Sequence, residues 1–361
     1  MHKRGVISIK IVLAGGGTAG HVTPNIALIP ALKEAGFTDI QYIGTNGIEK
    51  ELITKEGIPF HEIKAGKLRR YLDMENVKDI FRIIKGTRQA KKILKELRPD
   101  VVFSKGGFAS CPVVWSAKKL KIPVVAHESD ITPGLANKLS LPSANKICYA
   151  FPETKAHLPQ DKAVYTGIPI RPAFFEGNRQ KGLSFLGFSG DKPLLTIIGG
   201  SQGSKFLNDT VRGNLDTLLK TFDICHLCGK DNADDALKST KGYKQFEYVH
   251  AELADIMQAT DLFVSRAGAT TLFEILAMQK PSVLIPLSKG SRGDQILNAN
   301  SFEKQGYAKK LDEETMTEQS FLETVLSVYN DKEKYHTAMA SAKDLNSAEK
   351  IISVLKETIK K

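Results

Sequence analysis

Short apolar runs alternate with amphipathic segments along most of this 361-residue chain. In the first half, continuous apolar runs predict strands at residues 7–14, 40–44, 60–63, 101–104, 123–126, 146–149 and 163–166. Helical spacing of apolar residues lies between them, at 24–35, 49–56 and 75–97. The segment 75–97 carries Val77, Ile80, Ile84, Leu94 and Leu97 on or near one face, which we expect to be buried.

The pattern starts again after a proline-containing linker at residues 167–172. Strands are predicted at 194–198, 222–227, 246–249, 262–265 and 282–285, with helices between them. Strands that alternate with helices favour a parallel sheet covered by helices on both faces. We therefore predict an α/β protein of two doubly wound, Rossmann-like domains, at 1–170 and 171–345. The amphipathic segment 348–359 is a last helix with no strand after it.

Composition narrows the class of protein. Apolar residues make up 42% and charged residues 25%, which excludes a disordered chain, a collagen and a coiled coil. No apolar run is long enough for a membrane-spanning helix. Lys10 interrupts the apolar run near the N-terminus and a glycine-rich turn follows it, so we interpret this run as a strand and not as an export signal. Cys225 and Cys228 have metal-like spacing, but no second ligand pair lies nearby, which favours a buried strand.

The net charge of +11 favours an anionic partner. Residues 64–98 hold twelve Lys and Arg against four Asp and Glu, so most of the excess lies in one segment. Leu68, Tyr71, Leu72, Phe81 and Ile83 lie among these basic residues, and not all of them fit the buried face of the predicted helix. Basic residues beside exposed apolar ones suit an anionic membrane surface; a solvated helix face is the alternative. The segment has no recognition module or interleaved aromatic residues typical of nucleic-acid binding.

A glycine-rich turn, Gly15-Gly-Gly-Thr-Ala-Gly-His21, joins the first strand to the first helix. Such turns let backbone N–H groups approach a phosphate at a helix N-terminus. The spacing also fits a dinucleotide-binding fingerprint, but Gly44-Thr45-Asn46 stands where that fold needs an acidic residue for the ribose. His21 places an imidazole at the start of the helix, where a ligand role competes with a capping or core role.

Three further motifs follow strands in the second half. Gly199-Gly-Ser-Gln-Gly203 has the glycines and hydroxyl of a diphosphate-binding turn, beyond what a plain turn requires. In 265–274, Glu274 lies early in a helix, where it can accept ribose hydroxyls or simply favour the helix dipole. In 292–298, Asp294 and Gln295 offer the acceptors and donors that sugar hydroxyls need. In the first half, 104–110 and 127–137 also follow strands.

Taken together, GGGTAGH, SKGGF, HESD-TPGLAN, GGSQGS, SRAGATT-FE and GDQ-NA resemble the MurG family in their order and over nearly the whole chain. Its members are N-acetylglucosaminyltransferases of peptidoglycan synthesis that convert lipid I to lipid II on the cytoplasmic face of the cell membrane. The resemblance implies the GT-B fold, in which two doubly wound domains face a cleft. It also implies that helix 346–361 packs back on the first domain. Domain 1–170 would serve the acceptor and the membrane, and 171–345 the UDP-sugar.

The resemblance implies roles for individual residues. The donor, UDP-N-acetylglucosamine (UDP-GlcNAc), would contact Thr18, Ala19, Gly20, Arg171, Ser201, Gln202, Gly203, His250, Arg266, Gly268, Ala269, Thr270, Thr271, Glu274, Asp294 and Gln295. Within this set, Ser201 would hold the diphosphate, Glu274 the ribose, Gln295 the sugar and the backbone near His250, after the strand at 246–249, the uracil. The acceptor, polyprenyl-pyrophosphate-linked N-acetylmuramyl pentapeptide (lipid I), would contact Gly16, Gly17, Gly106, Gly107 and Asn137.

The implied reaction is a single inverting displacement at the anomeric carbon by the 4-hydroxyl of N-acetylmuramic acid, which needs a base and stabilisation of the leaving UDP. His21 is the leading base, because histidine titrates near neutral pH, and Asp130 or a water is the alternative. Many relatives have HEQN where this chain has His127-Glu-Ser-Asp130, and Gln where Asp294 stands, so the roles of the two aspartates stay open. The sequence has no Asp-x-Asp triplet, the motif that would suggest a diphosphate held by a metal ion. We therefore expect no cofactor or metal. A diacylglycerol glycosyltransferase, a UDP-GlcNAc 2-epimerase and, less favoured, a nicotinamide oxidoreductase are the alternative enzymes.

Overall fold

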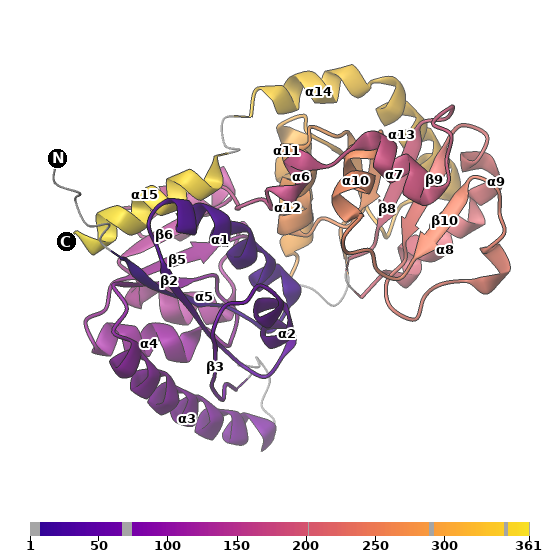
Figure 1. Cartoon of the computed structure of the whole chain (residues 1–361). Helices are drawn as coiled ribbons and strands as arrows, with labels where there is room; N and C mark the ends of the chain where they lie inside the picture. Colours follow the sequence, from indigo (N-terminus) through magenta and orange to yellow (C-terminus); the bar gives the residue numbers. More distant parts are fainter. Residues whose placement is uncertain (1–7, 67–73, 201, 289–291, 343–345, 361) are drawn as a thin grey trace. The chain divides into compact units, whose positions relative to one another are not determined.

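The computed structural model describes residues 8–66, 74–200, 202–288, 292–342 and 346–360, and for 74–78 it describes the backbone alone. The chain divides into two compact units (Figure 1). Unit 1 comprises Met1–Arg171 and Asn346–Lys361, and unit 2 comprises Pro172–Leu345.

Unit 1 is built on a seven-stranded parallel sheet in the order β3-β2-β1-β4-β5-β6-β7. The strands are β1 (Lys10–Ala14), β2 (Asp39–Gly44), β3 (Phe60–Glu62), β4 (Val101–Ser104), β5 (Val124–Glu128), β6 (Lys146–Tyr149) and β7 (Ala163–Tyr165). Alternate residues of β1 enter two different cores: Ile11 and Leu13 join one, and Val12 and Ala14 the other. Both faces of the sheet are therefore covered, as parallel sheets require.

Helices of unit 1 divide between these two faces. Their bounds are α1 (Thr23–Glu34), α2 (Ile48–Lys55), α3 (Met74–Leu97), α4 (Cys111–Lys119), α5 (Leu135–Ser140) and α15 (Ser347–Ile359), with short 3-10 turns η1 (Ala19–His21), η2 (Leu141–Ser143) and η3 (Pro152–His157). α1 and α15 pack on the face of Ile11, and α3 and α4 pack on the face of Val12. The C-terminal helix buries Ile351 and Leu355 there, so the end of the chain completes the core of its first half.

Unit 2 repeats this architecture with a six-stranded parallel sheet in the order β10-β9-β8-β11-β12-β13. The strands are β8 (Leu194–Ile198), β9 (Asp223–Leu227), β10 (Tyr243–Phe246), β11 (Leu262–Ser265), β12 (Ser282–Leu284) and β13 (Lys309–Lys310). The helices are α6 (Ala173–Glu176), α7 (Arg179–Leu186), α8 (Lys205–Gly213), α9 (Leu215–Leu218), α10 (Leu253–Ala259), α11 (Ala269–Ala277), α12 (Asp294–Lys304), α13 (Glu318–Asn330), α14 (Lys332–Ala340) and the turn η4 (Asp235–Leu237). α8 and α13 pack on one face of the sheet, and α7 and α10 on the other.

Two expectations about single elements are wrong. The strand predicted at 246–249 is β10 at Tyr243–Phe246, so His250 lies in the loop beyond it. The predicted buried face of α3 is also incorrect in part, because Ile80 is 56% and Ile84 44% exposed. Leu94 is buried as expected, so among the residues whose side chains are described, the core contacts of α3 lie in its C-terminal half; the side chain of Val77 is outside that part. Among the described residues, no helix is long and apolar enough to cross a membrane.

Candidate active site

In each unit, the order of the strands indicates where along the edge of the sheet a ligand is expected to bind. Chain order reverses between β1 and β4 in unit 1, and between β8 and β11 in unit 2. Parallel α/β sheets bind ligands at such switch points, outside the carboxyl ends of the strands. The glycine-rich turn 15–20 and the SKGGF turn follow β1 and β4, while the second glycine turn and the SRAGATT segment follow β8 and β11. The topology thus places these four segments at the switch points, while HESD-TPGLAN follows β5 and GDQ-NA follows β12, the next strand in each sheet.

In unit 1, the two glycine turns pack directly on each other. Gly107 has a φ of +80°, and a Cβ there would lie 2.2 Å from the carbonyl oxygen of Gly16. Gly17 has a φ of +91°, and a Cβ there would lie 2.5 Å from the ring of Phe108. Only glycine fits these conformations and this separation. The turns therefore form a surface of backbone that a ligand can approach closely.

His21 ends η1 at the margin of this surface and is partly buried. Its Nδ1 lies 2.9 Å from Thr18 Oγ1, and a Cβ at Gly107 would lie 3.4 Å from its ring. If Nδ1–H donates to the threonine hydroxyl, the lone pair of Nε2 is left to accept a proton. Thr18 thus orients the ring that we predicted as the base.

Beneath the glycine turns lies a buried polar cluster at the ends of β4 and β5. Asn137 Nδ2 donates to Glu128 Oε2 at 2.6 Å, and the backbone N–H of Asp130 donates to Glu128 Oε1 at 3.0 Å. Lys105 is 1% exposed, and its Nζ donates to Ser129 Oγ. A Cβ at Gly106 would lie 2.5 Å from Asn137 Oδ1, so the cluster supports the SKGGF turn from below.

Burial and the charges of neighbouring side chains shift the pKa values of the ionisable groups in this cluster. Desolvation and the Asp130 carboxylate raise the pKa of Glu128 to about 7, although Asn137, the Asp130 N–H and Lys105 oppose them. Desolvation lowers the pKa of Lys105 to about 8, against the attraction of Glu128 and Asp130. Burial holds the pKa of His127 well below its usual range, which keeps its ring neutral beside them. The cluster therefore titrates close to physiological pH.

A second buried carboxylate ties the first glycine turn to the segment after β2. Glu49 is fully buried and accepts hydrogen bonds from Thr45 N at 3.0 Å, from the Thr45 hydroxyl and from Gly17 N at 3.3 Å. It borders a cavity of about 470 Å³ that Gly17, Phe108 and Arg82 also line. The cavity opens beside the predicted acceptor residues of unit 1 and offers room for part of a ligand.

In unit 2, the second glycine turn precedes α8. Gly203 has a φ of +73°, and a Cβ there would lie 2.1 Å from the carbonyl oxygen of Cys228, so the turn packs tightly on the end of β9. Gln202 and Gly203 lie in this turn, while Ser201 lies outside the described residues. Ser204 caps α8, with its Oγ accepting from Leu207 N at 3.3 Å. The positive end of the α8 dipole thus faces the same edge of the sheet.

Arg266 is anchored within the protein. Its guanidinium donates to Glu313 Oε2 at 2.8 Å, to Ser204 Oγ at 2.6 Å and to the Ile285 carbonyl at 3.0 Å. Arg266 is 7% exposed. Arg266, which we predicted to contact UDP-GlcNAc, therefore also links the ends of β11 and β12 to the start of α8. Glu313, which the sequence motifs did not single out, fixes its orientation.

The predicted UDP-GlcNAc contacts of the SRAGATT-FE and GDQ motifs lie at the starts of α11 and α12, whereas Thr18, Ala19 and Gly20 lie in unit 1, at the start of η1. Gly268 precedes α11, Ala269 and Thr270 open it, and Thr271 and Glu274 follow one helical turn apart on one face. Glu274 is 7% exposed. At α12, Asp294 pairs with Arg292 at 2.6 Å, and Gln295 Oε1 accepts from Leu287 N at 3.0 Å.

One cavity of unit 2 brings only some of these residues together. It has a volume of about 290 Å³ and is lined by Gly199, Gly203, Ser204, Lys205, Phe206, Arg266, Leu287, Gln295 and Glu313. Glu274 and His250 are not among its lining residues; the His250 ring stacks on Tyr248 with centroids 5.7 Å apart. Arg171 belongs to unit 1, at the end of the loop after β7.

Comparison with known proteins decides the family. The N-terminal domain model of glycosyltransferase family 28 matches residues 11–149, and the C-terminal domain model matches residues 194–355. The chain belongs to glycosyltransferase family 28. Within this family, a protein of Lachnoclostridium phytofermentans is 54% identical over 96% of this chain and 98% of its own. One of Clostridium tetani is 53% identical over the same shares. Both are named UDP-N-acetylglucosamine--N-acetylmuramyl-(pentapeptide) pyrophosphoryl-undecaprenol N-acetylglucosamine transferase.

A solved structure of this type also matches. The crystal structure of Acinetobacter baumannii MurG is 26% identical, with a TM-score of 0.74 over 97% of this chain and 99% of that one. The prediction of a MurG-type, GT-B glycosyltransferase is confirmed, with two parallel-sheet domains of seven and six strands.

For this family 28 enzyme, sequence motifs located the loops but missed several side chains that shape them. Lys105 and Glu128 fall inside the motifs SKGGF and HESD, yet nothing in their spacing showed that they are buried together. Glu49 and Glu313 lie outside every motif. A buried carboxylate that accepts backbone N–H groups becomes visible only once the fold brings its partners together.

Proposed function

We propose that the enzyme transfers N-acetylglucosamine from UDP-GlcNAc to the 4-hydroxyl of N-acetylmuramic acid in lipid I, giving lipid II for peptidoglycan synthesis. The observation that carries this proposal is the identity of 52% or more to transferases named for this reaction, over nearly the full length of both chains. Each unit also presents a glycine-rich turn at its switch point, which suits a donor diphosphate in unit 2 and an acceptor pyrophosphate in unit 1.

The residues of the two units supply the chemistry that an inverting displacement needs. In unit 1, His21 takes the proton of the acceptor hydroxyl, with Asp130 or a water as the alternative base. In unit 2, helices α8, α11 and α12 begin after Ser204, Gly268 and Gly293, and their positive dipole ends can stabilise the negative charge that the leaving UDP gains. Departure of UDP with inversion converts an α-linked donor into a β-linked product in one step.

The acceptor that the enzyme uses distinguishes the proposed reaction from the reactions of the remaining alternative enzymes. Purified protein should release UDP from UDP-GlcNAc with a lipid I analogue, and should not do so with diacylglycerol. Without an acceptor, it should leave the configuration at C2 of the sugar unchanged. Transfer to diacylglycerol, or epimerisation at C2, would favour one of those alternatives instead.

Gln295 is proposed to contact the donor sugar and not the nucleotide. Gln295→Ala should weaken the binding of UDP-GlcNAc roughly 2- to 12-fold, which corresponds to the net value of one hydrogen bond, while UDP binds as before. Gln295→Glu is the matched variant, because its carboxylate can still accept from Leu287 N but cannot donate to a sugar oxygen. Titration calorimetry with both ligands makes the comparison. Equal losses for UDP and UDP-GlcNAc would remove Gln295 from the sugar site.

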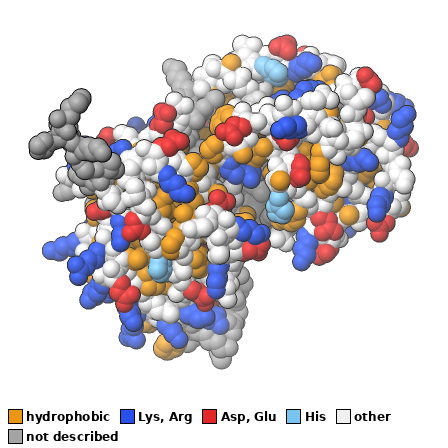
Figure 2. Space-filling model, viewed as in Figure 1, with side chains coloured by type: hydrophobic (Ala, Val, Ile, Leu, Met, Phe, Trp, Pro, Cys, Tyr) orange, Lys and Arg blue, Asp and Glu red, His pale blue; other side chains and the backbone are white. Residues whose placement is uncertain are grey.

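An exposed apolar patch on unit 1 supports a peripheral position on the cytoplasmic face of the cell membrane. The patch consists of the exposed residues Ile80, Phe81 and Ile84 on α3 and Leu139 on α5, beside the half-buried Trp115 on α4; Phe81 is 68% exposed. Lys67 to Leu72, the other part of the predicted membrane segment, lies outside the described residues. Figure 2 shows Lys and Arg side chains along the lower edge of unit 1 in this view.

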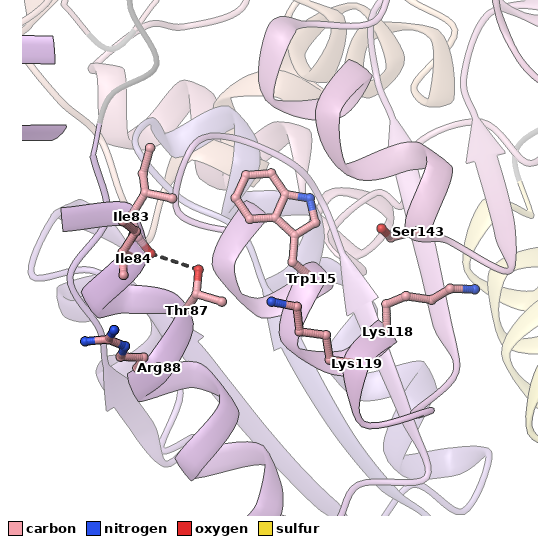
Figure 3. Close-up of a pocket in the computed structure, with 8 residues that line it drawn as sticks. All are labelled: Ile83, Ile84, Thr87, Arg88, Trp115, Lys118, Lys119 and Ser143. Atoms are coloured by element: carbon pink, nitrogen blue, oxygen red, sulfur yellow. Dashed lines mark hydrogen bonds between the residues drawn. The ribbon is translucent and has the colours of Figure 1, made fainter. Parts of the chain in front are cut away.

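A groove of about 490 Å³ adjoins the patch, between α3 and α4. Ile83, Ile84 and Trp115 form its apolar walls, and Arg88, Lys118 and Lys119 bring positive charge to it (Figure 3). Trp115 is held in place by its Nε1, which donates to the Leu139 carbonyl at 3.1 Å. Apolar side chains that enter the headgroup layer beside basic residues suit an anionic leaflet.

The positive charge of the groove beside the patch should therefore control vesicle binding. Lys118→Gln with Lys119→Gln should weaken binding to vesicles that contain anionic lipid by roughly 30-fold, at ~1 kcal/mol per residue. Lys238→Gln with Lys241→Gln, exposed lysines of unit 2, is the control. Cosedimentation at several salt concentrations measures the effect, with UDP affinity checked in parallel. Undiminished binding by the first variant would place the membrane contact elsewhere on the chain.

A further inference from the structure

Lys105 is a buried charge to which the proposed reaction assigns no role. It follows β4 at the switch point of unit 1 and is 1% exposed. Burial removes the hydration of an ammonium, so such a group persists only where opposite charge and hydrogen bonds compensate. Here the Ser129 hydroxyl accepts from Nζ, and the carboxylates of Glu128 and Asp130 attract its charge.

The groups around Glu128 come from several elements. Lys105 follows β4, Asn137 lies on α5, and Ser129 and Asp130 follow β5. Next to them, His127 is neutral, with its Nε2 2.8 Å from the Gly167 carbonyl oxygen. A Cβ at Gly107 of the SKGGF turn would lie 3.4 Å from the His21 ring. The Asp130 carboxylate, which is half-buried, raises the pKa of the buried Glu128, and the Lys105 ammonium lowers it. Without Lys105, the Asp130 charge would act on Glu128 without this opposing charge, which raises the pKa of Glu128 further.

The ionised form of Glu128 is the form that fits its contacts. Its two carboxylate oxygens accept separately, one from Asn137 Nδ2 and the other from Asp130 N. A proton on either oxygen would occupy one of its lone pairs and remove the negative charge that strengthens both contacts. Asn137 in turn packs against Gly106 of the SKGGF turn. The charge of Glu128 therefore holds together α5, the 128–130 loop and the predicted acceptor turn.

We propose that Lys105 is a positioning residue for the transfer reaction: its ammonium offsets the Asp130 carboxylate and so favours the ionised form of Glu128, which holds Asn137 and the SKGGF turn in the form that receives the acceptor. The contact with the acceptor rests on the proposed function, whereas the ionisation of Glu128 does not. The proposal also gives Asp130 a role in this chain, as the charge that Lys105 compensates.

The ionisation of Glu128 can be measured directly. In protein labelled with ¹³C at the glutamate side-chain carboxyl, the Glu128 resonance is the one missing from Glu128→Gln. Lys105→Met should raise the midpoint of its titration by about 1–3 pH units, the usual effect of removing a close opposite charge. Asp130→Asn should lower the midpoint, and the double variant should return it towards that of the unaltered protein. Lys33→Met, an exposed lysine on α1, is the control and should leave it unchanged.

The activity readout is the pH dependence of kcat/KM for a lipid I analogue. Its acidic limb should move to higher pH in Lys105→Met and back in the double variant, whatever the height of the profile. An unmoved Glu128 midpoint in Lys105→Met would overturn the proposal; if that variant fails to fold, an Asp130→Asn midpoint that is not lowered would do the same. A moved midpoint with an unmoved limb would overturn the positioning role. Predicted midpoints without any transfer by the unaltered protein would instead count against the proposed function.

Discussion

Replacement of His21 by alanine should lower kcat by about 10²–10⁴-fold and leave the affinity for UDP unchanged. The reason is its position: the ring lies beside Gly107 of the predicted acceptor surface, and Thr18 Oγ1 lies 2.9 Å from Nδ1. A base that removes the proton of the acceptor hydroxyl acts in the chemical step and not in donor binding. Single-turnover kinetics with a lipid I analogue, together with UDP titration, measures the two separately.

Two variants separate a base from a merely structural histidine. His157→Ala, at an exposed histidine of the same unit, should retain full activity. Thr18→Val removes the partner of Nδ1 and should reduce kcat more mildly, because the ring remains but loses its orientation. Near-normal turnover of His21→Ala would return His21 to a structural role and leave Asp130 or a water as the base.

Loss of the Glu274 carboxylate should weaken the binding of UDP and the binding of UDP-GlcNAc equally. Glu274 lies in the second turn of α11, on the same face as Thr271, and is 7% exposed. If it accepts the ribose hydroxyls, both ligands lose the same charge-assisted contact in Glu274→Ala. That loss is about 1.5–3 kcal/mol, or roughly 10- to 150-fold in Kd. Titration calorimetry with each ligand gives the two values.

An exposed glutamate of unit 2 provides the matched control. Glu323→Ala on α13 should bind both ligands as the unaltered protein does. Thermal unfolding of Glu274→Ala, followed in the absence of ligand, shows whether the variant retains its fold. A folded Glu274→Ala with unchanged affinity for UDP would show that the carboxylate serves the helix dipole and not the ribose.

Much of the fold could be predicted from the apolar pattern, because buried parallel strands appear as short continuous apolar runs. β4, β6, β8 and β11 have the predicted bounds. β10 does not, because Tyr243 at its start is buried while Tyr248 in the predicted run is exposed. The exposure of Ile80 and Ile84 on α3 was also missed, because helical periodicity shows which residues share a face but not what covers that face.

The candidate site was predictable at the level of loops. Glycine-rich motifs after strands identified both switch points, because close approach of backbone to a phosphate demands glycine at fixed spacing. The supporting side chains were not predictable in the same way. Arg266 meets Glu313, and Lys105 meets Ser129, across 47 and 24 residues of sequence respectively. Such pairs depend on the fold of the whole unit and have no local signature.

The structure of the product formed from UDP-GlcNAc and a lipid I analogue shows directly whether the enzyme carries out the proposed transfer. Carbon-13-labelled donor, purified enzyme and the analogue are incubated together, and the product is analysed by NMR. We expect one N-acetylglucosamine per acceptor, attached through a β linkage to the 4-hydroxyl of N-acetylmuramic acid, with one UDP released per transfer. An α linkage, attachment at another hydroxyl, or consumption of the donor without transfer to lipid I would contradict the proposed transfer.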